Sequence, residues 1–194
     1  MISWVRTVEP TLTVVTVDDA KSHCRISHDH EDALLHTLIR AATSWVERYT
    51  VRALMTQSYR IVSETWPASL ELPYACPLQS ITSVKYYDAS NVQQTLASSE
   101  YLTITSLLPG RLEWSATVTY PSTYLRPDAV EVIYVAGYTD AANVPPPLVQ
   151  AVLMLVGHWH ANREAAIVSA ISKEVEFSVQ ALCQPYRLFW SPSC

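Results

Sequence analysis

The stretch Leu148-Val-Gln-Ala-Val-Leu-Met-Leu-Val-Gly-His-Trp-His-Ala-Asn-Arg-Glu164 decides the fold of this 194-residue chain. Three prolines, residues 145–147, precede it, and proline suits the first turn of a helix because the N–H it lacks would have no intrahelical partner there. The first nine residues are apolar at nearly every position, so the predicted helix has no polar side to turn toward water. Such a helix must be covered on every face. The cover is either the chain's own core or a neighbouring copy, and the stretch alone leaves both open.

Two further helices are predicted near the N-terminus. Thr16-Val-Asp-Asp19 has the pattern of a capping box, a hydroxyl residue followed three positions later by an acidic one, and predicts a short helix through Cys24. Apolar residues then recur at helical spacing, which predicts a second helix over 29–50. Residues 27–32, Asp29 among them, are expected to supply its caps and negative charge for its N-terminus. A last short helix is predicted over 178–184.

Between these helices the pattern changes to short runs of β-branched and aromatic residues, separated by residues that favour turns. The runs predict six short strands in an antiparallel sheet or small sandwich. The predicted strands are Ser58–Thr65, Ser69–Leu72, Ser80–Tyr87, Tyr101–Thr105, Arg111–Trp114 and Ala129–Ala136.

The order of these elements predicts an α+β fold in a single domain, residues 1–194. We expect N-terminal helices in 1–56, an inserted antiparallel β module in 57–140, and a C-terminal helix with a docking tail in 145–194. Together the helices would form a base into which the β module is inserted.

Composition limits the possible functions. Hydrophobic residues make up 49% of the chain and charged residues 16%, against a typical charged share of roughly 25%. Surplus apolar surface usually contacts a partner, and a large aromatic core is the alternative explanation. The net charge is −5, and residues 61–150 hold three basic against eight acidic side chains. Gripping DNA phosphates requires clustered Lys and Arg, so a dedicated DNA-binding factor is disfavoured.

Cysteine spacing and chain hydropathy point to an intracellular protein without membrane contact. The four cysteines show no CxxC pair, which predicts reduced thiols in a cytosolic setting. The longest apolar run is about a dozen residues, too short to span a bilayer. We therefore predict no membrane association.

Candidate metal and catalytic residues are few. Potential ligands gather only near the first two helices, without recognised zinc spacings, so helix capping is favoured and a metal site is the minor alternative. The chain has three glycines and lacks a phosphate-binding glycine loop, GxSxG and HExxH. We predict no catalytic residue, no cofactor and no metal. The potential ligands are His23, Cys24, His28, Asp29, His30, Asp32 and His36.

The C-terminal segment 184–194 carries unusually large apolar side chains for a chain end. Terminal residues are usually polar and frayed, whereas Tyr186, Leu188, Phe189 and Trp190 would each gain roughly 1.5–3 kcal/mol from full burial. Two interpretations are open at this stage: the segment docks on a partner, or it folds back onto the chain's own helices.

Taken together, segments along most of the chain resemble the head-to-tail connector (adaptor) family of long-tailed double-stranded DNA bacteriophages and related gene-transfer particles. The order and spacing of the segments, rather than any one of them, carry the resemblance. The segments are 14–25, 29–32, 38–42, 46–47, 52–57, 72–73, 77–84, 86–88, 132–138, 144–145, 157–164 and 185–187.

The chain departs from the family pattern in three places. The family usually has glycine where Val51 stands, at the close of the second helix, where a left-handed residue would cap it, so we expect this helix to end differently. His160 and Ala161 replace the commoner Tyr and Glu before Asn162, and residues 165–183 match poorly.

The resemblance implies a structural virion protein and not an enzyme, assembled in the host bacterial cytoplasm. Such proteins form a ring, commonly of twelve copies, in the neck beneath the portal protein. The ring extends the channel for double-stranded DNA, which passes without sequence-specific binding, and presents a surface to a stopper or tail-terminator protein. The alternatives are another neck or tail component (a stopper or tail-completion protein), and, less favoured, a small metal-dependent enzyme or a DNA-binding packaging factor.

The resemblance also suggests two assembly surfaces. Family members often anchor to the portal through the C-terminal segment, so docking is expected at Tyr186, Arg187, Leu188, Phe189 and Trp190. A ring would also let neighbouring copies cover the apolar third helix, so a subunit interface is expected at Leu153, Val156, His158, Trp159, Asn162 and Arg163.

Overall fold

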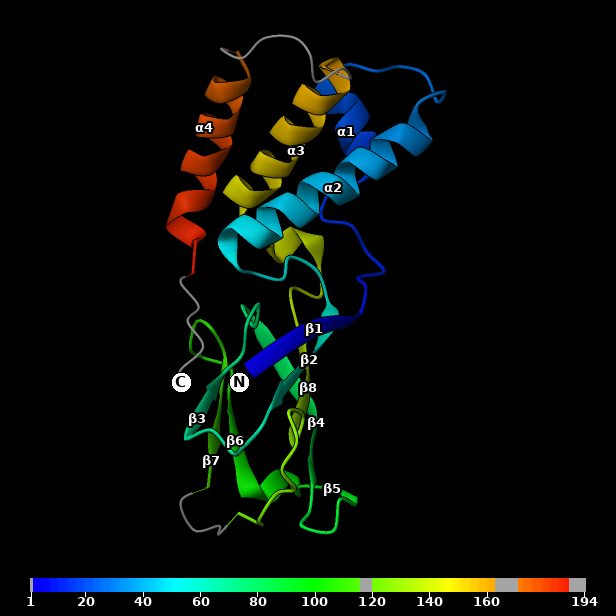
Figure 1. The fold of residues 1–194 in the computed structure, drawn as a ribbon. Helices are drawn as coiled ribbons and strands as arrows, with labels where there is room; N and C mark the ends of the chain where they lie inside the picture. Colours follow the sequence, from blue (N-terminus) through cyan, green and yellow to red (C-terminus); the bar gives the residue numbers. More distant parts are fainter. Residues whose placement is uncertain (1, 116–119, 163–170, 189–194) are drawn as a thin grey trace. The chain divides into compact units, whose positions relative to one another are not determined.

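A computed structural model describes residues 2–115, 120–162 and 171–188, and the chain forms two compact units (Figure 1). The β unit comprises Met1–Thr11, Thr56–Gly137 and Leu188–Cys194, and the helical unit comprises Leu12–Met55 and Tyr138–Arg187. The predicted α+β class is confirmed, since four helices accompany antiparallel sheets of five and three strands in the described chain. No described helix is both long and apolar enough to cross a membrane.

The β unit contains two antiparallel sheets. The larger has the strand order β1-β2-β8-β4-β5 and the smaller the order β3-β7-β6. Inward and outward positions alternate strictly along β2 and β8, the pattern of strands with one buried face. The strands are β1 (Ile2–Val8), β2 (Gln57–Ser63), β3 (Ser69–Glu71), β4 (Leu78–Tyr87), β5 (Gln93–Thr95), β6 (Tyr101–Ile104), β7 (Arg111–Trp114) and β8 (Val130–Ala136).

All six predicted strands are present, and two edge strands were missed. β1 lies in the segment where only helices were predicted, and its side chains do not alternate between buried and exposed. β5 is the polar run Gln93–Thr95, with every residue exposed. Both strands are defined by pairing with β2 and β4 rather than by hydrophobic pattern, and that pairing is not visible in the local sequence.

Aromatic side chains fill the interior of the β unit. Tyr59 and Tyr134 are almost completely buried and stack with ring centroids 5.5 Å apart. The Tyr134 hydroxyl donates a hydrogen bond of 2.5 Å to the carbonyl oxygen of Pro73, which satisfies the polar end of a buried ring. Burial raises the pKa of Tyr134 well above its ordinary value. The high aromatic content therefore serves in part as core.

The helical unit is organised around its third helix. The helices are α1 (Val17–Cys24), α2 (Asp32–Thr50), α3 (Pro146–Ala161) and α4 (Ile171–Cys183). α3 contacts the other three. Its buried positions are Leu148, Ala151, Val152, Leu155 and Val156. Of the two covers left open by the sequence, the chain's own core therefore supplies most of the cover for this helix.

The start of α1 is as predicted, and the start of α2 is not. Thr16 Oγ1 accepts a hydrogen bond of 3.1 Å from the Asp19 N–H, and the Asp19 carboxylate accepts one of 3.0 Å from the Thr16 N–H, completing the capping box. α2 begins at Asp32 instead of residue 29. The Asp29 carboxylate, expected to cap it, lies 2.6 Å from Lys21 Nζ instead.

The end of α2 corrects a second expectation. Val51 adopts the left-handed conformation, with φ 55° and ψ 43°, and its N–H donates to the Glu47 carbonyl oxygen. The helix therefore ends as a glycine would end it, although Val51 carries a β-branched side chain that this conformation disfavours.

α4 is longer than predicted. It begins at Ile171 rather than residue 178 and passes into a 3-10 turn at Gln184–Tyr186. Val175, Val179 and Cys183, spaced four apart, pack toward the core of the helical unit. The four-residue spacing of these apolar side chains is itself a helical signal in the sequence.

Candidate functional site

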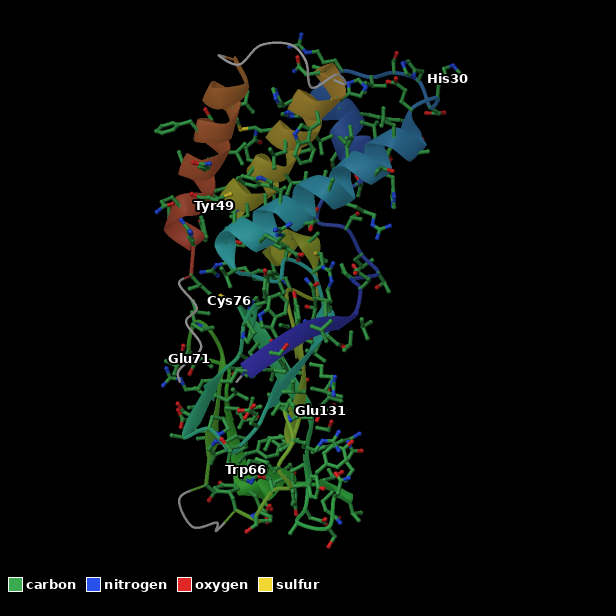
Figure 2. All side chains as sticks on the ribbon, viewed as in Figure 1. His30, Tyr49, Trp66, Glu71, Cys76 and Glu131 are labelled. Atoms are coloured by element: carbon green, nitrogen blue, oxygen red, sulfur yellow. The ribbon has the colours of Figure 1, made fainter. Side chains whose placement is uncertain are left out.

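The described root of the C-terminal segment lies against α2 of the same helical unit. Figure 2 shows Tyr49 near the C-terminal ends of α2 and α4. Its hydroxyl donates a hydrogen bond of 2.9 Å to Gln184 Oε1, and its ring stacks on Trp45 with centroids 5.2 Å apart and planes 5° from parallel. The Arg187 guanidinium lies 5.1 Å from the centroid of the Tyr49 ring. Two aromatic rings of α2 thus form a platform for the segment.

Arg52 holds the next part of the segment. It is 8% exposed, and its Nε donates a hydrogen bond of 2.5 Å to the Tyr186 carbonyl oxygen. The same guanidinium lies 5.8 Å from the centroid of the half-buried Tyr186 ring, which packs against the core of the helical unit. Of the two interpretations left open by the sequence, the structure shows folding back for Tyr186 and Arg187.

Of the other three candidate docking residues, the structure describes only Leu188. Leu188 is half-buried and belongs to the β unit, whereas Arg187 before it belongs to the helical unit. Phe189 and Trp190 lie outside the described residues. The docking hypothesis therefore depends on 188–190, with 184–187 as its ordered root.

The candidate interface residues of α3 do not form one surface. Val156 is fully buried in the helical unit, and Trp159 packs against the same core. Asn162 Nδ2 donates a hydrogen bond of 3.0 Å to the His158 carbonyl oxygen and lies 3.3 Å from the ring Nδ1, so these two residues share a face as expected. Arg163 lies outside the described residues.

Leu153 lines a feature that the sequence did not predict. An open groove of about 400 Å³ runs between α1 and α3, with Val149 and Leu153 on the α3 side. The close approach of the helices depends on Gly157, where an added Cβ would lie 3.3 Å from the His23 ring. The lining is Val15, Asp19, Ser22, His23, Val149 and Leu153.

Four of the candidate metal ligands near α1 and α2 are engaged in other contacts, and His36 is exposed. Lys21 Nζ lies 2.6 Å from carboxylate oxygens of both Asp29 and Asp32. These hydrogen bonds raise the pKa of Lys21, and the Lys21 ammonium lowers the pKa of Asp29. The rings of His28 and His30 stack on each other with centroids 5.3 Å apart, and Figure 2 shows His30 at the outer edge of the helical unit.

Within the part of the chain that the structure describes, no three His, Cys, Asp or Glu side chains are arranged to hold a metal. Cys24, Cys76 and Cys183 form no disulfide bond there. Burial raises the pKa of Cys183 to about 11, away from the thiolate form that nucleophilic chemistry requires. The arrangement supports packing and ion pairing.

Comparison with known families identifies this architecture. The family model described as "Phage gp6-like head-tail connector protein" matches residues 14–110, half of the chain. The chain belongs to this head-tail connector family. The matched segment runs from the loop before α1 to the loop before β7, and so takes in parts of both units of the connector.

Solved structures extend the likeness to nearly the whole connector. One, the neck of an empty gene transfer agent (GTA) particle computed with C6 symmetry, is 24% identical, with a TM-score of 0.76 over 98% of this chain and 97% of that one. Another, the virion of a native GTA particle, is 23% identical with a TM-score of 0.72 over 98% and 97%. A third, the native neck computed with C12 symmetry, is 23% identical with a TM-score of 0.69 over 95% and 97%. At this identity they show a shared fold. No curated protein matches the chain significantly.

Proposed function

We propose that this connector is a structural virion protein of the neck, a head-to-tail adaptor and not an enzyme. Copies would form a ring under the portal protein, extend the DNA channel and offer the attachment surface for a stopper or tail-terminator protein. Membership of the head-tail connector family carries the proposal. The necks of similar fold were computed with sixfold and twelvefold symmetry, which supports a ring of identical chains, with twelve copies as the proposed number.

The charge of the β unit suits a channel through which DNA passes without being held. Its arginines are engaged by carboxylates: Arg60 pairs with Glu131, Arg111 Nη2 lies 2.5 Å from Glu71, and Arg126 Nε lies 2.6 Å from Asp128. A paired guanidinium offers little positive charge to phosphates, and affinity for DNA rises with the number of phosphates neutralised. We therefore expect the β unit to have little non-specific affinity for DNA, and we propose that the DNA passes without sequence-specific binding.

Portal docking is assigned to the C-terminal segment. Residues 184–187 are held by Tyr49 of α2 and by Arg52, which follows that helix. Phe189 and Trp190 are large rings that would each gain roughly 1.5–3 kcal/mol on full burial against a partner. An ordered root with an apolar end is a suitable anchor because less conformational entropy is lost when it binds.

Electron microscopy of the full chain mixed with purified portal rings tests this function. We expect a second ring coaxial with the portal, with copies of this chain related by rotation. A portal that stays bare in saturating connector would refute the adaptor role. Binding only to portals that already carry another neck protein would favour the alternative, a stopper or tail-completion protein.

A further inference from the structure

The outer face of α4 exposes a large apolar side chain. Val175, Val179 and Cys183 turn toward the core of the helical unit, and Phe177 follows Val175 by two residues, about 200° around the helix. Phe177 is 75% exposed, the highest value for a large apolar side chain among the described residues of the helical unit. Ala181, one turn further along, is also exposed. α4 therefore presents a ring with a small residue beside it, away from its own core.

The groove between α1 and α3 lies on the other flank of the same unit. α1 and α4 each pack on α3, and Figure 1 shows them on opposite sides of it. Val149 and Leu153, one turn apart on α3, are half-exposed in this groove. Asp19, Ser22 and His23 of α1 make its rim polar. An apolar floor within a polar rim is the usual anatomy of a pocket that receives an aromatic side chain.

We propose that Phe177 of one copy inserts into the α1–α3 groove of the next copy around the neck. The inference rests on the proposed ring and names the contact that builds it. Copies related by rotation meet through two different surfaces, one on each flank, and the contact closes when the rotation does. The exposed Phe177 side chain and the groove meet this requirement, because each chain carries both of them, on opposite flanks of α3. A second copy is therefore the occupant.

Replacement of the Phe177 side chain tests the contact between copies. Phe177→Ser should leave the fold of the chain intact, because the side chain is mostly in solvent. It should weaken association between copies roughly 10- to 100-fold per contact, the effect of removing one buried phenyl group. The matched control is Leu125→Ser, which removes a 94% exposed apolar side chain from the β unit and should assemble as wild type does.

Cross-linking tests which surfaces meet. One batch carries Phe177→Cys and a second carries Ser22→Cys at the groove rim, both in a background with Cys24 and Cys194 replaced by serine. Because Phe177→Cys also removes the phenyl group and weakens the contact, the chains are mixed in the presence of portal and at a concentration that restores rings. A short thiol cross-linker should then give linked dimers from the mixture and from neither batch alone. Since the two thiols are on different chains, the product can only be intermolecular.

The outcomes separate this inference from the proposed function. Rings that form normally with Phe177→Ser and show no link between positions 177 and 22 would overturn the contact and leave the ring standing. A link from position 177 to itself would also overturn it, since that contact is isologous. Wild-type protein that forms no ring, even with portal present, would overturn both.

Discussion

Two truncations separate the anchoring role of the C-terminal segment from its structural role. A chain ending after Arg187 keeps every described contact between the segment and α2 and lacks Phe189 and Trp190. A chain ending after Gln184 also loses the Tyr186 ring, which packs on the core, and the carbonyl that accepts the Arg52 hydrogen bond. If 188–190 form the anchor, both chains should fail to bind portal, and only the shorter should be less stable.

The stability difference can be estimated from the contacts removed. Loss of the half-buried Tyr186 ring costs about 0.75–1.5 kcal/mol, half the value for full burial. Its contact with the Arg52 guanidinium and the contact of Arg187 with the Tyr49 ring add about 0.5–1 kcal/mol each. The lost hydrogen bond to Arg52 adds about 1 kcal/mol. The sum is roughly 3–4.5 kcal/mol, which lowers Tm by at least about 6 °C in a chain of this length.

Thermal unfolding followed by circular dichroism measures the first effect, and sedimentation with purified portal measures the second. The chain ending after Arg187 should stay within about 1 kcal/mol of wild type, because the only described residue it loses is the half-buried Leu188. Normal portal binding by this chain would refute the anchor. A Tm for the shorter chain equal to that of the longer one would refute the contacts to Tyr49 and Arg52 as stabilising interactions.

Three further substitutions test the local arguments. Val51→Gly should raise the free energy of unfolding by about 0.5–1 kcal/mol, because relief of roughly 1–2 kcal/mol of left-handed strain exceeds the entropy cost of glycine. Val51→Ala is the control, since alanine keeps the Cβ that causes the strain. An equal gain in stability from Val51→Ala would contradict the strain argument. Gly110→Ala should destabilise the β unit by about 1–3 kcal/mol in chemical denaturation, because the new Cβ would lie 2.3 Å from the Leu78 Cβ; an unchanged midpoint would disprove the close contact. Asp19→Ala should cost about 0.5–1 kcal/mol at neutral pH by breaking the capping box. Hydrogen bonds from Thr16 lower the pKa of Asp19 below its ordinary 3.8. The stability contributed by the capping box is therefore present above pH 3.8 and is lost as the pH falls through the lower folded-state pKa, so the stabilities of wild type and variant should converge in acid. A stability difference that does not change with pH would contradict this role of Asp19.

The sequence by itself predicted those elements whose structure depends on residues close together in the chain. The capping box at Thr16, the central strands β2 and β8 with their alternating pattern, and the helix after Pro145 are all readable from spacing alone, because capping, pleat and helical pitch act over a few residues. The pairing of His158 with Asn162 was predictable for the same reason.

Contacts between distant segments determined the rest. The sequence showed that α3 needed cover on all sides, and only the tertiary structure showed that α1, α2 and α4 of the same chain supply most of it. The edge strand β1 exists because β2, about fifty residues later, pairs with it. Val51 adopts a left-handed conformation that its own side chain disfavours by roughly 1–2 kcal/mol. The packing of the helix and the hydrogen bond from the Val51 N–H to the Glu47 carbonyl oxygen outweigh this local penalty. Spacing along the chain cannot report such effects, since their energies come from residues that only the fold brings together.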